Sequence, residues 1–104
     1  YVMDPHTAVG KTVTDRYREE TGDGLPVLMV ATASPFKFNR SVTQAILGEG
    51  AVQDKSEFEL LDKLQEISGH EIPVGLRGLD KKEIRHRIVC AKEAMPQIVR
   101  EILK

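Results

Sequence analysis

The sequence is poor in cysteine: Cys90 is the only one among its 104 residues. A single thiol excludes an internal disulfide framework and is typical of a reducing compartment. We therefore expect a cytoplasmic protein. The sequence also lacks a metal-binding pattern, because His6, His70 and His86 are far apart and no pair of Cys or His has the spacing of a zinc site. We expect no metal site.

Neither sign of charge is in excess, with 15 Lys and Arg against 16 Asp and Glu, giving a net charge of −1. This balance argues against a nucleic-acid surface or an anionic membrane as the partner. The longest apolar run, residues 25–33, is too short to span a bilayer. The 40% hydrophobic and 30% charged residues are ordinary for one small globular domain.

The chain starts abruptly, with the apolar residues of "YVM" directly before a helix-start signal. This pattern is typical of a chain that was cut at the end of a strand. We expect a fragment of a larger protein; a small protein whose tag was removed is the alternative.

The first half of the sequence predicts a helix followed by a strand. Asp4 and Pro5 form a helix start and Gly22 a helix end, with apolar residues at every fourth position between them. Residues 25–33 are almost continuously apolar, which is typical of a strand covered on both faces of a parallel sheet. Residues 71–76 are the one other strand candidate, so partner strands are expected outside this chain.

The second half predicts three further helices. Asn39 begins the first and Gly48 ends it, while a capping box at Ser56 begins the second, over residues 56–68. The last is expected over residues 80–102, with a kink or restart at Pro96. The expected fold class is therefore α/β: a mostly helical chain with one main buried strand, residues 25–33, and four helices packed around it.

Two stretches carry candidate site residues. Thr32, Ala33 and Ser34 stand at the carboxyl end of the expected strand, where ligands bind in open α/β sheets. Small side chains there permit close approach of a flat ligand, although the two hydroxyls could instead serve local backbone groups before Pro35. "DPHTAVG" is the second stretch, in which His6 and Thr7 could face a pocket at the positive helix end or lie on the surface.

Both stretches together resemble one family. "DPHTAVG" at residues 4–10 and "ATASPFKF" at residues 31–38, followed by "SVTQAILG", resemble the C-terminal part of threonine synthase. The separation of the two motifs also fits, and "EIPVGLRGL" resembles the tail of bacterial members. Many members have His where this chain has Ser34.

The resemblance implies a fragment of a fold-type-II pyridoxal-phosphate enzyme. It makes Thr32 the hydroxyl that faces the pyridine nitrogen of the cofactor, beside Ala33 and Ser34. Asp4, His6 and Thr7 would line the edge of the same pocket. Residues 1–50 would then belong to the cofactor domain and residues 51–104 to a helical tail.

Members of this family are lyases of threonine biosynthesis that convert O-phospho-L-homoserine and water into L-threonine and phosphate. The Schiff-base lysine of the family lies upstream of these motifs, so the resemblance implies that this chain alone is inactive and does not hold the cofactor. Its partners would be the N-terminal remainder of the enzyme and the substrate, and the exposed strand predicts self-association of the isolated piece.

Two alternatives stay open. One is another lyase of the same cofactor fold, such as a dehydratase. The other is a free-standing helical interaction module, in which the apolar stripes of residues 60–67 and 84–102 form a bundle that binds a partner.

Overall fold

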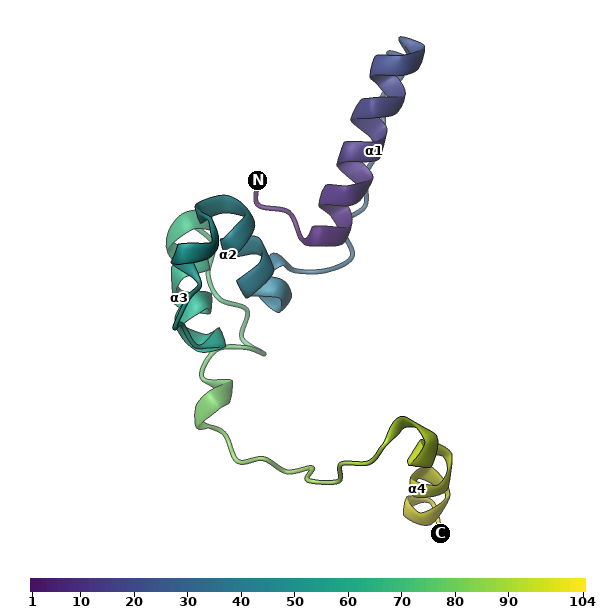
Figure 1. Ribbon diagram of the computed structural model, residues 1–104, viewed down its shortest axis with the longest axis vertical. Coiled ribbons are helices and arrows are strands. Elements are labelled where there is room, and N and C mark those ends of the chain that lie inside the picture. The colour runs from purple at the N-terminus through teal and green to yellow at the C-terminus, as the bar shows by residue number, and fades with distance from the viewer.

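The computed structural model describes residues 1–104 as an elongated chain of helices. Its radius of gyration is 18.9 Å and its extents are 58 × 33 × 25 Å, whereas a compact chain of this length would have a radius of gyration of about 13 Å. Helix α1, the packed pair α2 and α3, and the distant helix α4 follow one another along its length (Figure 1). The helices lack the combination of length and hydrophobicity that a membrane-spanning helix requires.

Helix α1 (Pro5–Thr21) begins and ends as the sequence predicts. The carboxylate of Asp4 caps its first turn, and Gly22 follows its last residue at φ 71°, in the left-handed region that glycine adopts most easily. Its apolar stripe does not face a core, because Val9, Val13 and Tyr17 are each more than half exposed.

The predicted buried strand is wrong. Residues 25–33 are extended, but no other segment pairs with them and the chain contains no strand. The side chain of Leu28 is 90% exposed and that of Val30 71% exposed. A strand exists only through hydrogen bonds to a neighbouring strand, and residues 71–76, the second candidate, are irregular up to residue 73 and then form a turn. The fold class is therefore helical, not α/β.

The core lies between α2 (Asn39–Leu47) and α3 (Glu57–Ser68), the two helices with the most extensive mutual contact. The predicted capping box of Ser56 and Glu59 begins α3, and Gly69 ends it. The short 3-10 helix η1 (Pro35–Phe38) and the loop after α3 complete the cluster. Its five buried members are Phe36, Val42, Leu61, Leu64 and Ile72.

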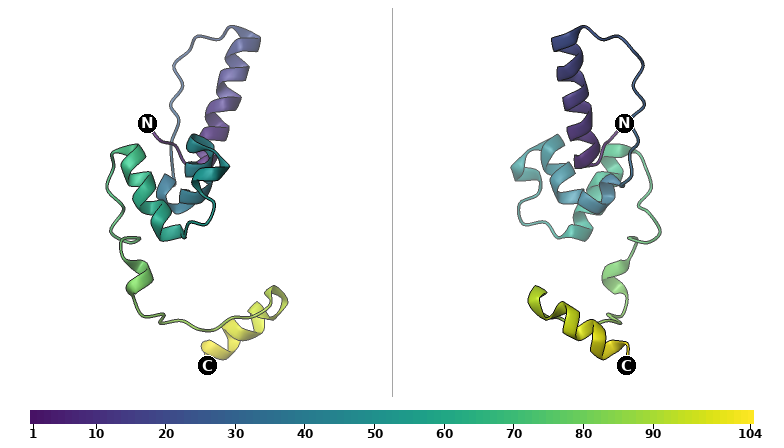
Figure 2. Two further views of the ribbon diagram at one scale, coloured as in Figure 1. Left: turned by 60° about the vertical axis from the view of Figure 1, so that its left-hand side comes forward. Right: turned by 90° about the vertical axis from the view of Figure 1, so that its right-hand side faces the viewer.

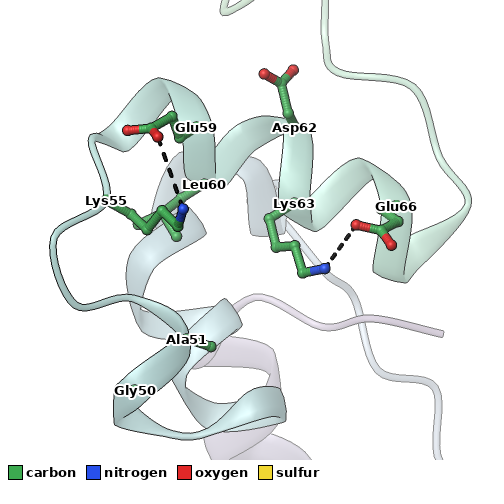
Figure 3. Close-up of a pocket in the computed structure, with 8 residues that line it drawn as sticks. All are labelled: Gly50, Ala51, Lys55, Glu59, Leu60, Asp62, Lys63 and Glu66. Carbon is green, nitrogen blue, oxygen red and sulfur yellow. Dashed lines mark hydrogen bonds and ion pairs between the residues drawn. The ribbon is translucent and has the colours of Figure 1, made fainter.

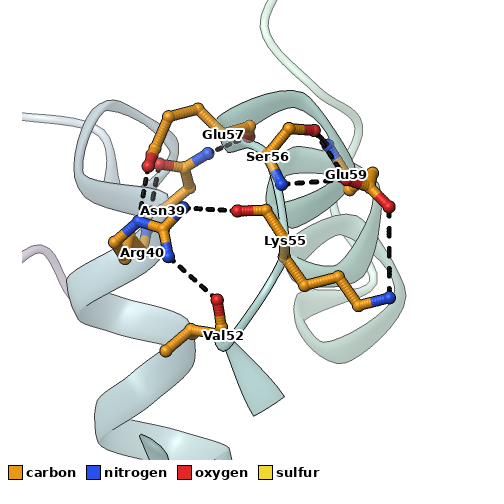
Figure 4. A network of polar contacts seen from close by, with 7 residues as sticks. All are labelled: Asn39, Arg40, Val52, Lys55, Ser56, Glu57 and Glu59. Carbon is orange, nitrogen blue, oxygen red and sulfur yellow. Dashed lines mark hydrogen bonds and ion pairs between the residues drawn. The ribbon is translucent and has the colours of Figure 1, made fainter. Parts of the chain in front are cut away.

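A polar network fastens the loop between α2 and α3, which contains the 3-10 helix η2 (Glu49–Ala51) (Figure 4). The guanidinium of Arg40 donates to the carbonyls of Val52 at 2.9 Å and Lys55 at 2.6 Å, and it pairs with the carboxylate of Glu57. The amide of Asn39 donates to the Glu57 carbonyl. Asn39 thus ties α2 to α3, and Phe38 occupies the capping position that the sequence predicts for Asn39.

The prediction of one long final helix is also wrong. Only a 3-10 turn, η3 (Leu79–Lys81), forms at the expected start, and residues 83–91 are extended and exposed. After the 3-10 turn η4 (Lys92–Ala94), helix α4 (Met95–Ile102) begins one residue before Pro96, which confirms the predicted restart. Residues 84–91 have no surface to bury their apolar side chains, and packing supplies most helical stability. The apolar stripes of residues 60–67 and 84–102 therefore form no bundle.

Candidate functional site

The structure brings the two sequence motifs together. Residues 22–34 run back beside α1, so the start of that helix lies near η1 (Figure 2). The ring of His6 packs edge-on against the ring of Phe38, with centroids 5.1 Å apart. A groove of about 360 Å³ lies between α1 and the extended segment, and both Thr7 and Ala31 line it.

Asp4 organises the first turn of α1. Its side chain is only 1% exposed, and its carboxylate accepts hydrogen bonds from the backbone N–H of His6 at 3.0 Å and of Thr7 at 3.4 Å. The Thr7 hydroxyl donates to the second carboxylate oxygen. This hydroxyl and the backbone donors outweigh burial and lower the pKa of Asp4. Asp4 is therefore an ionised helix cap, as its place before Pro5 predicts.

His6 is oriented but open to solvent. Its Nδ1 lies 3.2 Å from the Asp4 carboxylate, and its side chain is 75% exposed. A carboxylate at Nδ1 favours the proton on that nitrogen, which leaves Nε2 as an acceptor. Asp4, His6 and Thr7 thus form one hydrogen-bonded cluster, and Thr7 alone among them lines the groove.

The residues at the end of the extended segment differ in what their hydroxyls do. Ser34 accepts from the backbone N–H of Phe36 at 3.3 Å and caps η1, so it serves the local backbone. The Thr32 side chain is exposed and has no hydrogen-bond partner within the chain. Ala33 between them is partly buried. Of the two hydroxyls, only that of Thr32 is therefore free to meet a ligand.

The same groove contains residues that the sequence reasoning did not single out. Lys11 lines it and is held at 2.6 Å by Asp15 one turn later, and Met29 enters it beside Gly10. The signal that could have identified Lys11 is its spacing of four from Thr7, which places both on one face of a helix.

A larger hollow, of about 550 Å³, lies between η2 and α3 (Figure 3). Its two lysines are paired with glutamates, Lys63 with Glu66 at 2.8 Å and Lys55 with Glu59 at 4.0 Å. None of its lining residues belongs to either motif. No group of three or more His, Cys, Asp or Glu side chains is placed to hold a metal ion.

Comparison with known proteins decides the family. A sequence model described as "Threonine synthase, C-terminal" matches residues 7–102, nearly the whole chain. The chain belongs to this family. The matched range contains Thr7, Thr32, Ala33 and Ser34, whereas Asp4 and His6 lie just before it. The resemblance inferred from the two motifs is confirmed.

Curated relatives match over a shorter range. Threonine synthase-like 1 of Homo sapiens is 44% identical over 46 residues, which are 44% of this chain and 6% of the human protein. The protein of the same name from Mus musculus is 41% identical over 46 residues, with the same coverage. The chain thus spans about 6% of the length of the curated relatives it matches. No solved structure matches it.

Proposed function

We propose that this chain is the C-terminal part of a threonine synthase, a pyridoxal-phosphate lyase that converts O-phospho-L-homoserine and water into L-threonine and phosphate. The family match over residues 7–102 supports the proposal. The structural observation that most supports it is the groove lined by both Thr7 and Ala31, because each of these residues comes from one of the two motifs that carry the resemblance.

The residues at the end of the extended segment fit one edge of the cofactor. Thr32 offers an unpartnered hydroxyl, and its neighbours Ala31 and Ala33 carry only methyl groups, which leaves space for a flat ring. When bound, the cofactor supplies an electron sink for the bonds that break at the substrate. Thr32 would face the pyridine nitrogen, and a neutral hydroxyl there offers no full negative charge to hold a proton on that nitrogen.

The other site residues would act at the pocket edge. Asp4 fixes the orientation of His6, whose largely exposed side chain could contact substrate or cofactor, and Thr7 lines the groove. Ser34 is occupied with its own turn, so we assign it the positioning of Thr32 rather than ligand contact.

The catalytic lysine would come from the N-terminal remainder of the enzyme. The lysines of this chain lie on helix faces, in 3-10 turns or in loops, and none stands in a motif that matches the family's lysine. Covalent catalysis needs that lysine, so we propose that the isolated chain is inactive and retains no cofactor. Residues 1–50 would then close the cofactor pocket and residues 51–104 form the tail.

The test uses the natural full-length protein that contains this chain. The variant Thr32→Val removes the hydroxyl and keeps the shape, and Thr32→Ser keeps the hydroxyl. We expect the valine variant to lose at least tenfold in kcat and to shift the cofactor absorbance band, and the serine variant to retain both. Thr12→Val is the matched control, because Thr12 is an exposed threonine on α1. Unchanged turnover and spectrum in Thr32→Val would contradict the role of Thr32.

The alternative function is another lyase of the same cofactor fold. Comparing several substrates with the same full-length protein distinguishes it from threonine synthase. We expect O-phospho-L-homoserine to be consumed in preference to L-serine or L-threonine. The opposite preference would favour a dehydratase.

A further inference from the structure

The extended segment beside α1 has an unused set of backbone hydrogen-bonding groups. The last anchored residue is Leu25, whose N–H donates to Asp23 at 2.9 Å and whose carbonyl accepts from Arg18. None of the backbone groups of residues 26–33 bonds to another backbone group of the chain. No side chain of the chain bonds to these groups either, so the backbone donors and acceptors of the segment are free to pair with another strand.

The two faces of the segment differ. Val27, Met29 and Ala31 lie toward α1 and line the groove. Leu28 and Val30 alternate with them and are 90% and 71% exposed. The segment thus has the alternation of a strand with one face on a helix, and both of its edges are free (Figure 2).

The composition of the segment favours pairing with itself. Residues 27–33, "VLMVATA", contain no charge and no proline and include two valines and a threonine. Such neutral, apolar, β-branched edges are the ones that pair with another chain. The other extended stretch, residues 83–91, carries Arg85 and Arg87, and self-pairing there would bring like charges together.

We propose that residues 27–33 pair with the same segment of a second copy of this chain, antiparallel about a two-fold axis. Along one edge, each copy supplies hydrogen-bond partners for the N–H and C=O groups of the other, which is the self-complementary arrangement of a symmetric dimer. The net charge of −1 opposes the association only weakly. The inference concerns the isolated chain and does not depend on the proposed catalytic function.

The first test is the mass of the 104-residue chain in solution, by sedimentation or light scattering across a hundredfold range of concentration. We expect a monomer to convert to a dimer, with an infrared amide band of β-structure that grows in parallel. A monomer at every concentration would overturn the proposal.

Proline variants locate the interface. Proline removes one N–H, and consecutive residues of an extended segment direct their N–H groups to opposite edges. Only one of Val30→Pro and Ala31→Pro should therefore weaken the dimer, by at least tenfold in dissociation constant. Val89→Pro is the matched control, because Val89 is apolar, 94% exposed and in the other extended stretch.

The other possible results of the proline experiment also test the proposal. A dimer that survives both prolines, or is lost equally in Val89→Pro, would place the interface elsewhere and overturn the proposal. Loss in both Val30→Pro and Ala31→Pro would indicate pairing along both edges, an open-ended assembly, and overturn the closed dimer. Circular dichroism at 222 nm checks that the total helix content persists in each variant.

Discussion

The ring of His6 contacts the ring of Phe38 edge to face, with centroids 5.1 Å apart and planes at 63°. His6 belongs to the first turn of α1 and Phe38 ends η1, so the contact joins the two halves of the candidate site. The segment between them forms no backbone ladder. The relative position of the two motifs therefore depends on a few side-chain contacts.

The His6 and Phe38 contact should be measurable as a coupling. Aromatic pairs contribute about 0.5–1.5 kcal/mol beyond their buried area. We expect a double-mutant cycle of His6→Ala and Phe38→Ala, read from urea unfolding, to give a coupling of about 0.5 kcal/mol. Additive single effects would mean that the rings do not stabilise each other.

Acid should fray α1 from its first turn. The pKa of Asp4 is lowered by its hydrogen bonds to Thr7 and His6, so its stabilising effect is fully present above the unfolded-state pKa and is lost as the pH falls through the lowered folded-state value. We expect the protection factors of the Thr7 and Ala8 amides, which correct for the intrinsic pH dependence of exchange, to fall only in that acidic range, and to be low in Asp4→Ala at every pH. The protection in Asp4→Asn should lie between that of the unchanged chain and that of Asp4→Ala, because asparagine can still cap a helix. Protection factors that stay constant through the acidic range would contradict this role of Asp4.

Replacing Arg40 by lysine should loosen the loop between α2 and α3. Lysine cannot present the planar fork that serves the carbonyls of Val52 and Lys55 together. We expect Arg40→Lys to lower the free energy of unfolding by about 2 kcal/mol. The control Lys63→Ala breaks only an exposed ion pair with Glu66 and should cost less than about 0.5 kcal/mol. Equal losses of unfolding free energy in the two variants would contradict the role of Arg40 in holding this loop.

Trypsin should cut first between residues 81 and 92. This stretch is exposed and extended, with cleavable residues at Lys81, Lys82, Arg85, Arg87 and Lys92. We expect cleavage there at least tenfold faster than after Lys63, which lies within α3. Mass spectrometry of early digests identifies the sites. First cuts within α1 or α3 would show that residues 83–91 are protected in solution.

Local signals in the sequence predicted helix ends well. The cap at Asp4, the box at Ser56 and the glycines at 22, 48 and 69 all stand where the structure ends or begins a helix. These signals depend on hydrogen bonds within a few residues, so one sequence contains the information they need.

Elements that depend on distant partners were predicted wrongly. Residues 25–33 have the composition of a buried strand, yet a strand needs a neighbour that this chain does not provide. The same reason applies to residues 84–91, whose helical stripe has no surface to cover. Arg40 was missed because its partners lie 12 to 17 residues away, in a loop without a motif.

The candidate site was predicted in part. The sequence singled out Asp4, His6, Thr7 and Thr32, and the structure explains Asp4 as a helix cap and places Thr7 on the shared groove. Phe38, which contacts His6, and Lys11, which lines the groove, were not named as site residues. Their roles arise because residues 22–34 run back along α1, and no local sequence pattern predicts this path.

The most direct test is the product formed from O-phospho-L-homoserine by the natural full-length protein that contains this chain, supplied with pyridoxal phosphate. We expect L-threonine and phosphate in equal amounts, measured by chromatography and a phosphate assay, and neither product from the 104-residue chain alone. Phosphate without threonine, or no reaction at all, would contradict the proposed threonine synthase activity.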